Sequence, residues 1–313
     1  MRILITGVHG FVGSNLVNYL AKDNEIYGLD IIAPEKDGVV KTFSWDDLDA
    51  GRIPDVDAII HLAGVAHDIN DQALIDDYFR VNRDLTIKTF DYFRNHDCIK
   101  KFVFFSTVKA AADKVEGVLT EDVVPSPVGP YGESKRAAES YLLGKMEEVN
   151  NNNKKVYIFR PCMIHGPGNK GNLNLLYKVV RKGIPWPLGA FENRRTFTSV
   201  ENMCFAVNGF LTKDVPSGIY NLGDDDALST NELIEEICKS LGKKAHIWKL
   251  PKGLMIGLAK MGGWLHLPLN PYRLQKLTEN YISSNEKIKK ALGVTKMPVD
   301  ARTGLKTTLE SFK

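Results

Sequence analysis

Three glycines near the start of the chain limit its fold more than any other feature. Gly7, Gly10 and Gly13 follow an apolar run at residues 2–6 and open a stretch, residues 13–21, whose apolar side chains recur with helical spacing. A buried strand, a glycine turn and a helix in this order bring backbone N–H groups close to a bound phosphate. A glycine-rich turn without a ligand is the alternative. We predict a dinucleotide site made by Gly7, Gly10, Phe11, Val12 and Gly13.

Strands and helices alternate along the first half of the sequence. Apolar runs predict further strands, and helical spacing predicts helices between them: strands at residues 25–30, 57–62, 102–105 and 156–159, and helices at residues 73–96 and 131–145. This alternation is typical of an α/β fold with a Rossmann-type, doubly wound parallel sheet. After about residue 165, prolines and glycines cluster and the alternation stops. We therefore expect a cofactor-binding domain at residues 1–165, to which part of residues 196–222 returns, and a smaller C-terminal substrate domain at residues 166–313.

Composition narrows the class of protein. The chain has 313 residues, 43% of them hydrophobic, which is enough for one large or two coupled domains. Its 41 basic and 38 acidic side chains leave a net charge of +3, which argues against a nucleic-acid partner. Four scattered cysteines without a CxxC pair predict free thiols in a reducing compartment and no metal site. The opening strand carries no signal-peptide pattern, so we expect a cytoplasmic protein.

One later stretch, residues 254–269, is unusually apolar. It contains Lys260, His266 and several glycines, and it falls short of the ~20 apolar residues that a membrane-spanning helix requires. We therefore expect no stable membrane insertion. We interpret the stretch as a buried or lid helix, with weak contact to a membrane surface as the alternative.

Tyr131 and Lys135 form the strongest chemical signal in the chain. They stand four residues apart in Tyr-Gly-Glu-Ser-Lys, so one turn of helix places them on the same face. An ammonium beside a phenol stabilises the phenolate and is expected to lower the phenol's pKa from its usual ~10. With the dinucleotide site, this pair predicts an enzyme that moves a hydride and a proton at a carbinol carbon.

Other residues refine the predicted cofactor. Asp30 ends the second strand, 23 residues after Gly7, where a carboxylate can bind the adenosine ribose hydroxyls and repel a 2′-phosphate. This favours NAD, with NADP still possible, and a capping or surface aspartate is the alternative. After the predicted structural residue His61, a strand end brings backbone against the cofactor at Leu62, Ala63 and Gly64. Asn82 lies inside a predicted helix, where asparagine is unfavourable, so we assign it a polar role that braces the site.

These residues together resemble the extended short-chain dehydrogenase/reductases, in their nucleotide-sugar epimerase/dehydratase group. The resemblance covers nearly the whole chain. It is carried by GxxGFVG at 7–13, HLAG at 61–64, Asn82, Ser106-Thr107, YxxxK at 131–135, Arg160-Pro161 and Gly166-Pro167-Gly168.

The resemblance implies catalytic roles. Thr107 would be the hydroxyl partner of Tyr131, with Ser106 as the alternative, and Lys135 would also bind the nicotinamide ribose. Tyr131, Lys135, Asn82, Ser106 and Pro161 would border the cofactor. Sugar 4,6-dehydratases of this group follow the catalytic threonine with Asp-Glu, whereas this chain has Val108 and Lys109. We therefore predict no elimination of water.

The resemblance also implies a substrate. Arg195, Asn172 and Arg273 fall where the group binds a nucleotide diphosphate, although a lone arginine such as Arg273 can equally be a surface charge. The chain looks most like bacterial enzymes of surface-polysaccharide synthesis that reduce UDP-4-keto-6-deoxy-hexosamines. His165 departs from that pattern, because the group usually has tyrosine before Gly-Pro-Gly.

Three functions follow as hypotheses. The first is an NAD(P)-dependent 4-ketoreductase acting on a UDP-4-keto-6-deoxy-N-acetylhexosamine. The second is a UDP-glucose or UDP-N-acetylglucosamine 4-epimerase, which uses the same residues twice. The third, a remote alternative, is a sensor that binds NAD without turnover. The family resemblance further implies a homodimer, formed through the helices at residues 74–96 and 131–145.

Overall fold

A seven-stranded parallel sheet organises the protein. In the computed structural model, which describes residues 1–65, 75–169, 171–265 and 269–313, the strand order is β10-β7-β5-β4-β1-β2-β3. Every neighbouring pair in this sheet is parallel. The α/β doubly wound fold class predicted from the sequence is therefore confirmed. The strands are β1 (Arg2–Thr6), β2 (Glu25–Leu29), β3 (Lys41–Phe43), β4 (Ala58–His61), β5 (Lys101–Phe105), β7 (Lys155–Pro161) and β10 (Gly218–Leu222).

The central strand β1 is buried on both faces. Ile3 pairs with Ile26 of β2 and Ala58 of β4. Because successive side chains alternate between faces, Ile3 and Ile5 belong to one hydrophobic cluster and Leu4 to another. This explains why the first run of the sequence is continuously apolar rather than alternating.

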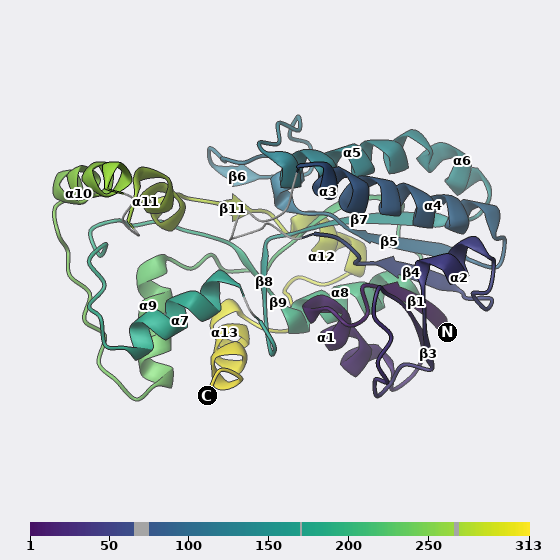
Figure 1. The fold of residues 1–313 in the computed structure, drawn as a ribbon, viewed down its shortest axis with the longest axis horizontal. Helices are drawn as coiled ribbons and strands as arrows, with labels where there is room; N and C mark the ends of the chain where they lie inside the picture. The colour runs from purple at the N-terminus through teal and green to yellow at the C-terminus, as the bar shows by residue number, and fades with distance from the viewer. Residues whose placement is uncertain (66–74, 170, 266–268) are drawn as a thin grey trace.

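Helices cover both faces of the sheet (Figure 1). On one face lie α1 (Phe11–Leu20), α8 (Val200–Thr212) and α12 (Glu286–Leu292), and on the other lie α2 (Trp45–Asp49), α4 (Leu85–Asn95), α5 (Pro130–Gly144) and α6 (Met146–Asn151). The direction in which successive strands are added to the sheet reverses between β1 and β4. At such a point the loops at the carboxyl ends diverge and leave room for a ligand.

The helix predicted at residues 73–96 is interrupted. Its described part consists of α3 (Ile75–Tyr78), a π-helical turn (Phe79–Asp84) and α4; residues 73 and 74 lie outside the described residues. The widened turn places Asn82 inside the protein with none of its surface exposed. π-helical turns of this kind often occur at functional sites.

The C-terminal part packs beside one end of the sheet (Figure 1). It contains α7 (Asn172–Arg181), α9 (Thr230–Ser240), α10 (Lys252–Trp264), α11 (Pro271–Thr278) and α13 (Ala301–Glu310). Two short parallel pairs join it to the rest, β8 (Met163–His165) with β9 (Phe197–Ser199), and β6 (Val118–Leu119) with β11 (Ile282–Ser283). Ser229 caps α9 through a capping box with Glu232. The division at residues 165/166 stays a prediction, although β10 joins the main sheet beside β7.

Helix α10 differs from the prediction for residues 254–269. Its buried residues are Met255, Ala259 and Gly262, and its larger apolar side chains are exposed. The helix is therefore not buried, because α11 covers one narrow stripe of it. Residues 266–268 lie outside the described residues.

Candidate active site

The glycine turn after β1 is too crowded for side chains. Gly7 adopts φ +68°, which favours glycine. A Cβ on Gly13 would lie 2.5 Å from the carbonyl oxygen of Gly7 and 2.8 Å from the Cα of Val8. Helix α1 begins at Phe11, and no described side chain caps it. Its first N–H groups therefore remain available to an anion, as a dinucleotide pyrophosphate requires.

Asp30 lies beside this turn. One carboxylate oxygen accepts the N–H of His9 at 3.1 Å, and the other accepts the N–H of Ile31 at 2.7 Å. These bonds hold the carboxylate at the carboxyl end of β2. Each oxygen keeps capacity for a further donor, so the group can still bind two ribose hydroxyls.

The loop after β4 touches the same turn. A Cβ on Gly7 would lie 3.0 Å from the Ala63 nitrogen, so the two loops are in backbone contact. A Cβ on Gly64 would lie 2.8 Å from Oδ1 of Asn82 and 3.1 Å from Nζ of Lys135. The predicted cofactor residues of β1, β2, β4 and α5 therefore meet at one edge of the sheet. The crowded glycines, the uncapped helix and the carboxylate fit a dinucleotide.

Tyr131 is positioned by the start of α5. Gly129 adopts φ +83° and Pro130 is the first helical residue, a combination that fixes where the helix begins. Tyr131 is half-buried, and its hydroxyl is hydrogen-bonded to the side chain of Thr107. The Lys109 N–H also donates to Oγ1 of Thr107, at 3.2 Å. The structure thus brings together the two hydroxyls that the sequence paired.

Ser106 faces a different partner. Its hydroxyl donates to Oε1 of Glu139 at 2.6 Å, and Glu139 is fully buried. Arg160, also fully buried, binds the same carboxylate through Nε at 2.8 Å and Nη2 at 2.6 Å. Sequence reasoning missed Glu139. The available signal was an acid four residues after Lys135, on the inner face of a helix.

Burial shifts the pKa values of Lys135 and Tyr131 in opposite directions. Burial lowers the pKa of Lys135 to about 8, and its Nζ donates to the Phe105 carbonyl at 2.9 Å. Burial also raises the pKa of Tyr131, and the hydrogen bond from Thr107 opposes this rise. The expectation that Lys135 lowers the pKa of the phenol is wrong for the ligand-free protein, because desolvation outweighs any stabilisation of the phenolate.

A buried chain of hydrogen bonds joins the glycine turn to the catalytic helix. Oγ1 of Thr6 accepts the N–H groups of Leu62 and Ala63, at 3.1 and 3.0 Å, so its own proton goes to Nδ1 of His61, 2.9 Å away. Nε2 of His61 then donates to Oγ1 of Thr86 at 3.0 Å. Burial lowers the pKa of His61 to about 3, so this imidazole is neutral.

The chain continues through Asn82. Thr86 donates to the Asn82 carbonyl at 2.7 Å. The Asn82 amide exchanges two hydrogen bonds with the Val65 backbone and donates to Ser134 on α5 at 3.1 Å. Because Asn82 has no exposed surface, we assign its effect on the site to these contacts.

The predicted substrate residues lie on the C-terminal side of the site. Arg195 is half-buried, and its Nη1 donates to the Lys276 carbonyl of α11 at 2.8 Å. Asn172 is the first residue of α7 and is exposed, and Arg273 is exposed on α11. The hydrogen bond to Lys276 thus brings Arg195 against α11, the helix that also carries Arg273.

A charged cluster next to Thr107 was not predicted. Lys109 and Lys276 both bind Oδ1 of Asp113, at 3.0 and 3.2 Å. Lys109 also lies over the ring of the buried Tyr281, 4.6 Å from its centroid. The positions that would carry Asp-Glu in a dehydratase therefore hold a buried valine, Val108, and an ion-paired lysine.

His165 has a structural environment. It is 2% exposed, its Nδ1 lies 2.8 Å from Oγ1 of Thr308 on α13, and its Nε2 lies 3.6 Å from the buried carboxylate of Asp224. The histidine that replaces the expected tyrosine therefore connects β8 to the C-terminal helix.

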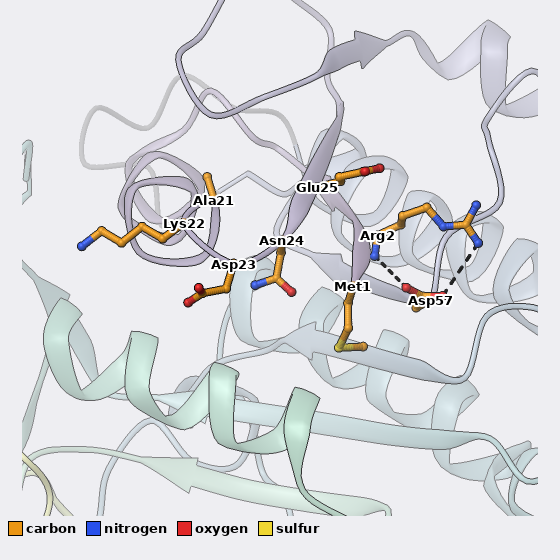
Figure 2. Close-up of a pocket in the computed structure, with 8 residues that line it drawn as sticks. All are labelled: Met1, Arg2, Ala21, Lys22, Asp23, Asn24, Glu25 and Asp57. Atoms are coloured by element: carbon orange, nitrogen blue, oxygen red, sulfur yellow. Dashed lines mark hydrogen bonds and ion pairs between the residues drawn. The ribbon is translucent and has the colours of Figure 1, made fainter.

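One surface hollow lies away from these residues. Figure 2 shows the residues that line it, at the amino ends of β1 and β2. The hollow has a volume of about 510 Å³. There the Arg2 N–H donates to Asp57 at 2.7 Å. Ligands of doubly wound sheets bind at the opposite, carboxyl edge, so we assign no function to this hollow.

Fold and site geometry fit an NAD-binding protein, and sequence comparison agrees. The chain belongs to the NAD dependent epimerase/dehydratase family, which matches residues 3–223. Its cofactor is accordingly NAD.

Particular relatives differ in reaction. UDP-glucose 4-epimerase of Vibrio cholerae is 29% identical over 267 residues, which are 80% of this chain and 78% of the relative. GDP-6-deoxy-D-mannose reductase of Pseudomonas aeruginosa is 27% identical over 254 residues, 75% and 78% of the two chains. The solved structure of MoeE5 in complex with UDP-glucuronic acid and NAD has a TM-score of 0.77 at 21% identity, covering 99% of this chain and 98% of that one. The family thus includes nucleotide-sugar epimerases and reductases.

Proposed function

We propose that the chain is a 4-ketoreductase that uses NADH to reduce a UDP-4-keto-6-deoxy-N-acetylhexosamine for surface-polysaccharide synthesis. One observation carries the proposal. The Thr107–Tyr131 hydroxyl pair lies at the carboxyl edge of the sheet, and the two residues after Thr107 provide no carboxylate. Such a site supports redox at one carbon without loss of water.

The proposed proton transfer uses the residues already in contact. When bound, NADH supplies the hydride. Tyr131 donates its proton to the substrate oxygen, and Thr107 orients that oxygen through a hydrogen bond. The raised pKa of Tyr131 keeps the phenol protonated at neutral pH, as a proton donor requires. The ammonium of Lys135 stabilises the negative charge that develops on the phenol.

Substrate recognition is proposed for the C-terminal side. The guanidinium of Arg195 suits a diphosphate, and so does the N-terminus of α7, where Asn172 lies. Arg273 on α11 would add a second guanidinium. The resemblance of these segments to those of UDP-sugar reductases supports the assignment.

A 4-epimerase is the second candidate, favoured by the relative from Vibrio cholerae. In that reaction Tyr131 would first remove the proton from the C4 hydroxyl and later return it. A sensor without turnover is the remote alternative, and the presence of both Tyr131 and Lys135 argues against it.

The decisive experiment supplies purified protein with NADH deuterated at the transferable position and a panel of UDP- and dTDP-4-keto-6-deoxy sugars. A reductase consumes NADH in proportion to product and leaves deuterium at C4. Protein that copurifies with stoichiometric NAD, interconverts UDP-hexose epimers and ignores 4-keto sugars would sink the reductase proposal in favour of the epimerase.

Tyr131→Phe is the matched variant, because it removes the hydroxyl and keeps the ring. We expect kcat to fall by about 100-fold or more with NADH binding retained. Retained activity would show that another group is the acid. Two further proposals, cytoplasmic location and a homodimer formed through α4 and α5, are testable by fractionation and analytical ultracentrifugation.

A further inference from the structure

Helix α10 presents an apolar surface to solvent. Trp264 is 80% exposed, Leu254 52% and Met261 50%. We define the α10 patch by five exposed side chains: Leu254, Leu258, Met261, Trp264 and Leu265. Exposed apolar groups are common singly, but a contiguous group on one helix marks an interaction site.

The patch is not needed to hold α10 in place. Met255 and Ala259 anchor the helix to Leu274 of α11 and to Leu188, and all four are buried. Leu254, Leu258, Met261 and Leu265 recur at intervals of four, three and four residues, which is one stripe of a helix. The helix is therefore apolar on the outward side as well as on the side that folding requires.

The surrounding segment is strongly basic. Residues 237–278 contain eight of the chain's 41 basic residues and none of its 38 acidic ones, so the remainder has a net charge of −5. Lys252 and Lys260 lie on α10 itself and are exposed. Among the described residues, neither has an ion-pair partner within 4.0 Å. The sequence segment that carries the patch is therefore basic, although its Lys276 is paired with Asp113 and Glu279.

We propose that the α10 patch docks on an anionic phospholipid surface. Leu, Met and Trp side chains on one side of a helix that also carries exposed lysines are what interfacial helices use. With 13 residues, α10 is about 20 Å long, and no described helix is long and apolar enough to cross a membrane. The helix lies at the periphery of the molecule, where a flat surface can reach it (Figure 1).

A second copy of the chain is the rival occupant. A two-fold dimer through this patch would place the same surface against itself and bring the basic segments together. That repulsion disfavours the dimer, whereas acidic lipid headgroups neutralise the same charge.

Vesicle binding by the full-length protein tests the proposal. We expect cosedimentation with vesicles of phosphatidylglycerol and phosphatidylcholine, none with phosphatidylcholine alone, and release at high salt. Trp264 fluorescence should shift to the blue and be quenched by brominated lipid. No binding to the anionic vesicles, or equal binding to neutral ones, overturns the proposal.

Matched variants locate the contact. Lys252→Gln with Lys260→Gln should weaken partitioning about 30-fold, since each lysine near an anionic surface contributes ~1 kcal/mol. Lys22→Gln with Lys306→Gln removes two exposed lysines elsewhere and should leave binding unchanged.

An apolar pair of variants completes the test. Met261→Glu with Trp264→Glu should weaken binding by about 100-fold or more, because both side chains lose apolar burial. Val124→Glu, at a residue 85% exposed outside the patch, should have no effect. If ultracentrifugation shows that the α10 double variant dissociates a dimer, or if it still binds vesicles like the wild type, the lipid proposal fails.

Discussion

His61 offers a quantitative test of the buried network, because its protonation is linked to folding. Its imidazole is fully buried between Thr6 and Thr86, and its pKa is lowered from 6.5 to about 3. The unfolded chain takes up a proton near pH 6.5, whereas the folded chain resists it down to about pH 3. The stability contributed by neutral His61 is therefore complete above pH 6.5 and is lost progressively as the pH falls towards 3.

The size of the effect follows from the two pKa values. Each pH unit within this window removes about 1.4 kcal/mol. Between pH 7 and pH 5, protonation of the unfolded state should lower the free energy of unfolding by about 2 kcal/mol. His61→Gln keeps an amide donor and acceptor and cannot titrate in this range, so it should lack this component.

Urea denaturation of both proteins at pH 7 and pH 5 measures the difference. The wild type should lose about 2 kcal/mol more than His61→Gln does, and contributions from other titrating groups cancel in the comparison. The exposed His246→Gln is the matched control and should behave as the wild type, because His61 remains. An equal loss in wild type and His61→Gln would refute a neutral, buried imidazole.

Three further predictions concern the site. Since the pKa of Lys135 is about 8, kcat/KM for reduction should fall about tenfold between pH 7 and pH 9 as the ammonium loses its proton. Lys135→Arg should not show this fall, and a wild-type kcat/KM that does not change with pH would contradict the prediction. Gly64→Ala should lower kcat by about 10-fold or more, because its Cβ crowds Asn82 and Lys135, whereas Gly144→Ala, with open space around it, should not. Asp30→Ser should raise the NADPH/NADH ratio of kcat/KM by about 10-fold or more, and an unchanged ratio would argue that Asp30 does not contact the ribose.

Several features of the fold were predictable because local pattern determines them. The apolar run before Gly7 is a buried strand for the reason that the sequence suggests, namely packing on both faces of the sheet. The sequence pattern does not predict a strand at β10, although part of residues 196–222 is expected to return to the cofactor domain, because the five residues of Gly218–Leu222 are too few for a clear strand pattern. Residues 254–269 are interpreted as a buried or lid helix because apolar composition usually indicates burial, and the sequence does not tell which neighbour covers a helix; the lid interpretation stays a prediction.

In the site, too, relations between residues close in sequence were predictable, and contacts between distant segments were not. Tyr131 and Lys135 lie on one helix, so their relation follows from spacing alone. The choice between Ser106 and Thr107 depends on which hydroxyl meets Tyr131 and which meets Glu139, and that requires the fold. The pairing of Glu139 with Arg160 across 21 residues was likewise invisible. The pKa of Tyr131 was misjudged, because spacing reveals a cation nearby but not how much water is lost.

The effect of the residues at positions 108 and 109 depends on the charges around them and not only on their own residue types. Lys109 is held by Asp113, which also binds Lys276, so one carboxylate serves two ammonium groups. A glutamate at position 109 would face Asp113 and repel it, and an aspartate at position 108 would be buried without a cation. An acid pair inserted here would therefore be electrostatically unfavourable. The charge balance around Asp113 accordingly favours the lysine that the chain has at position 109.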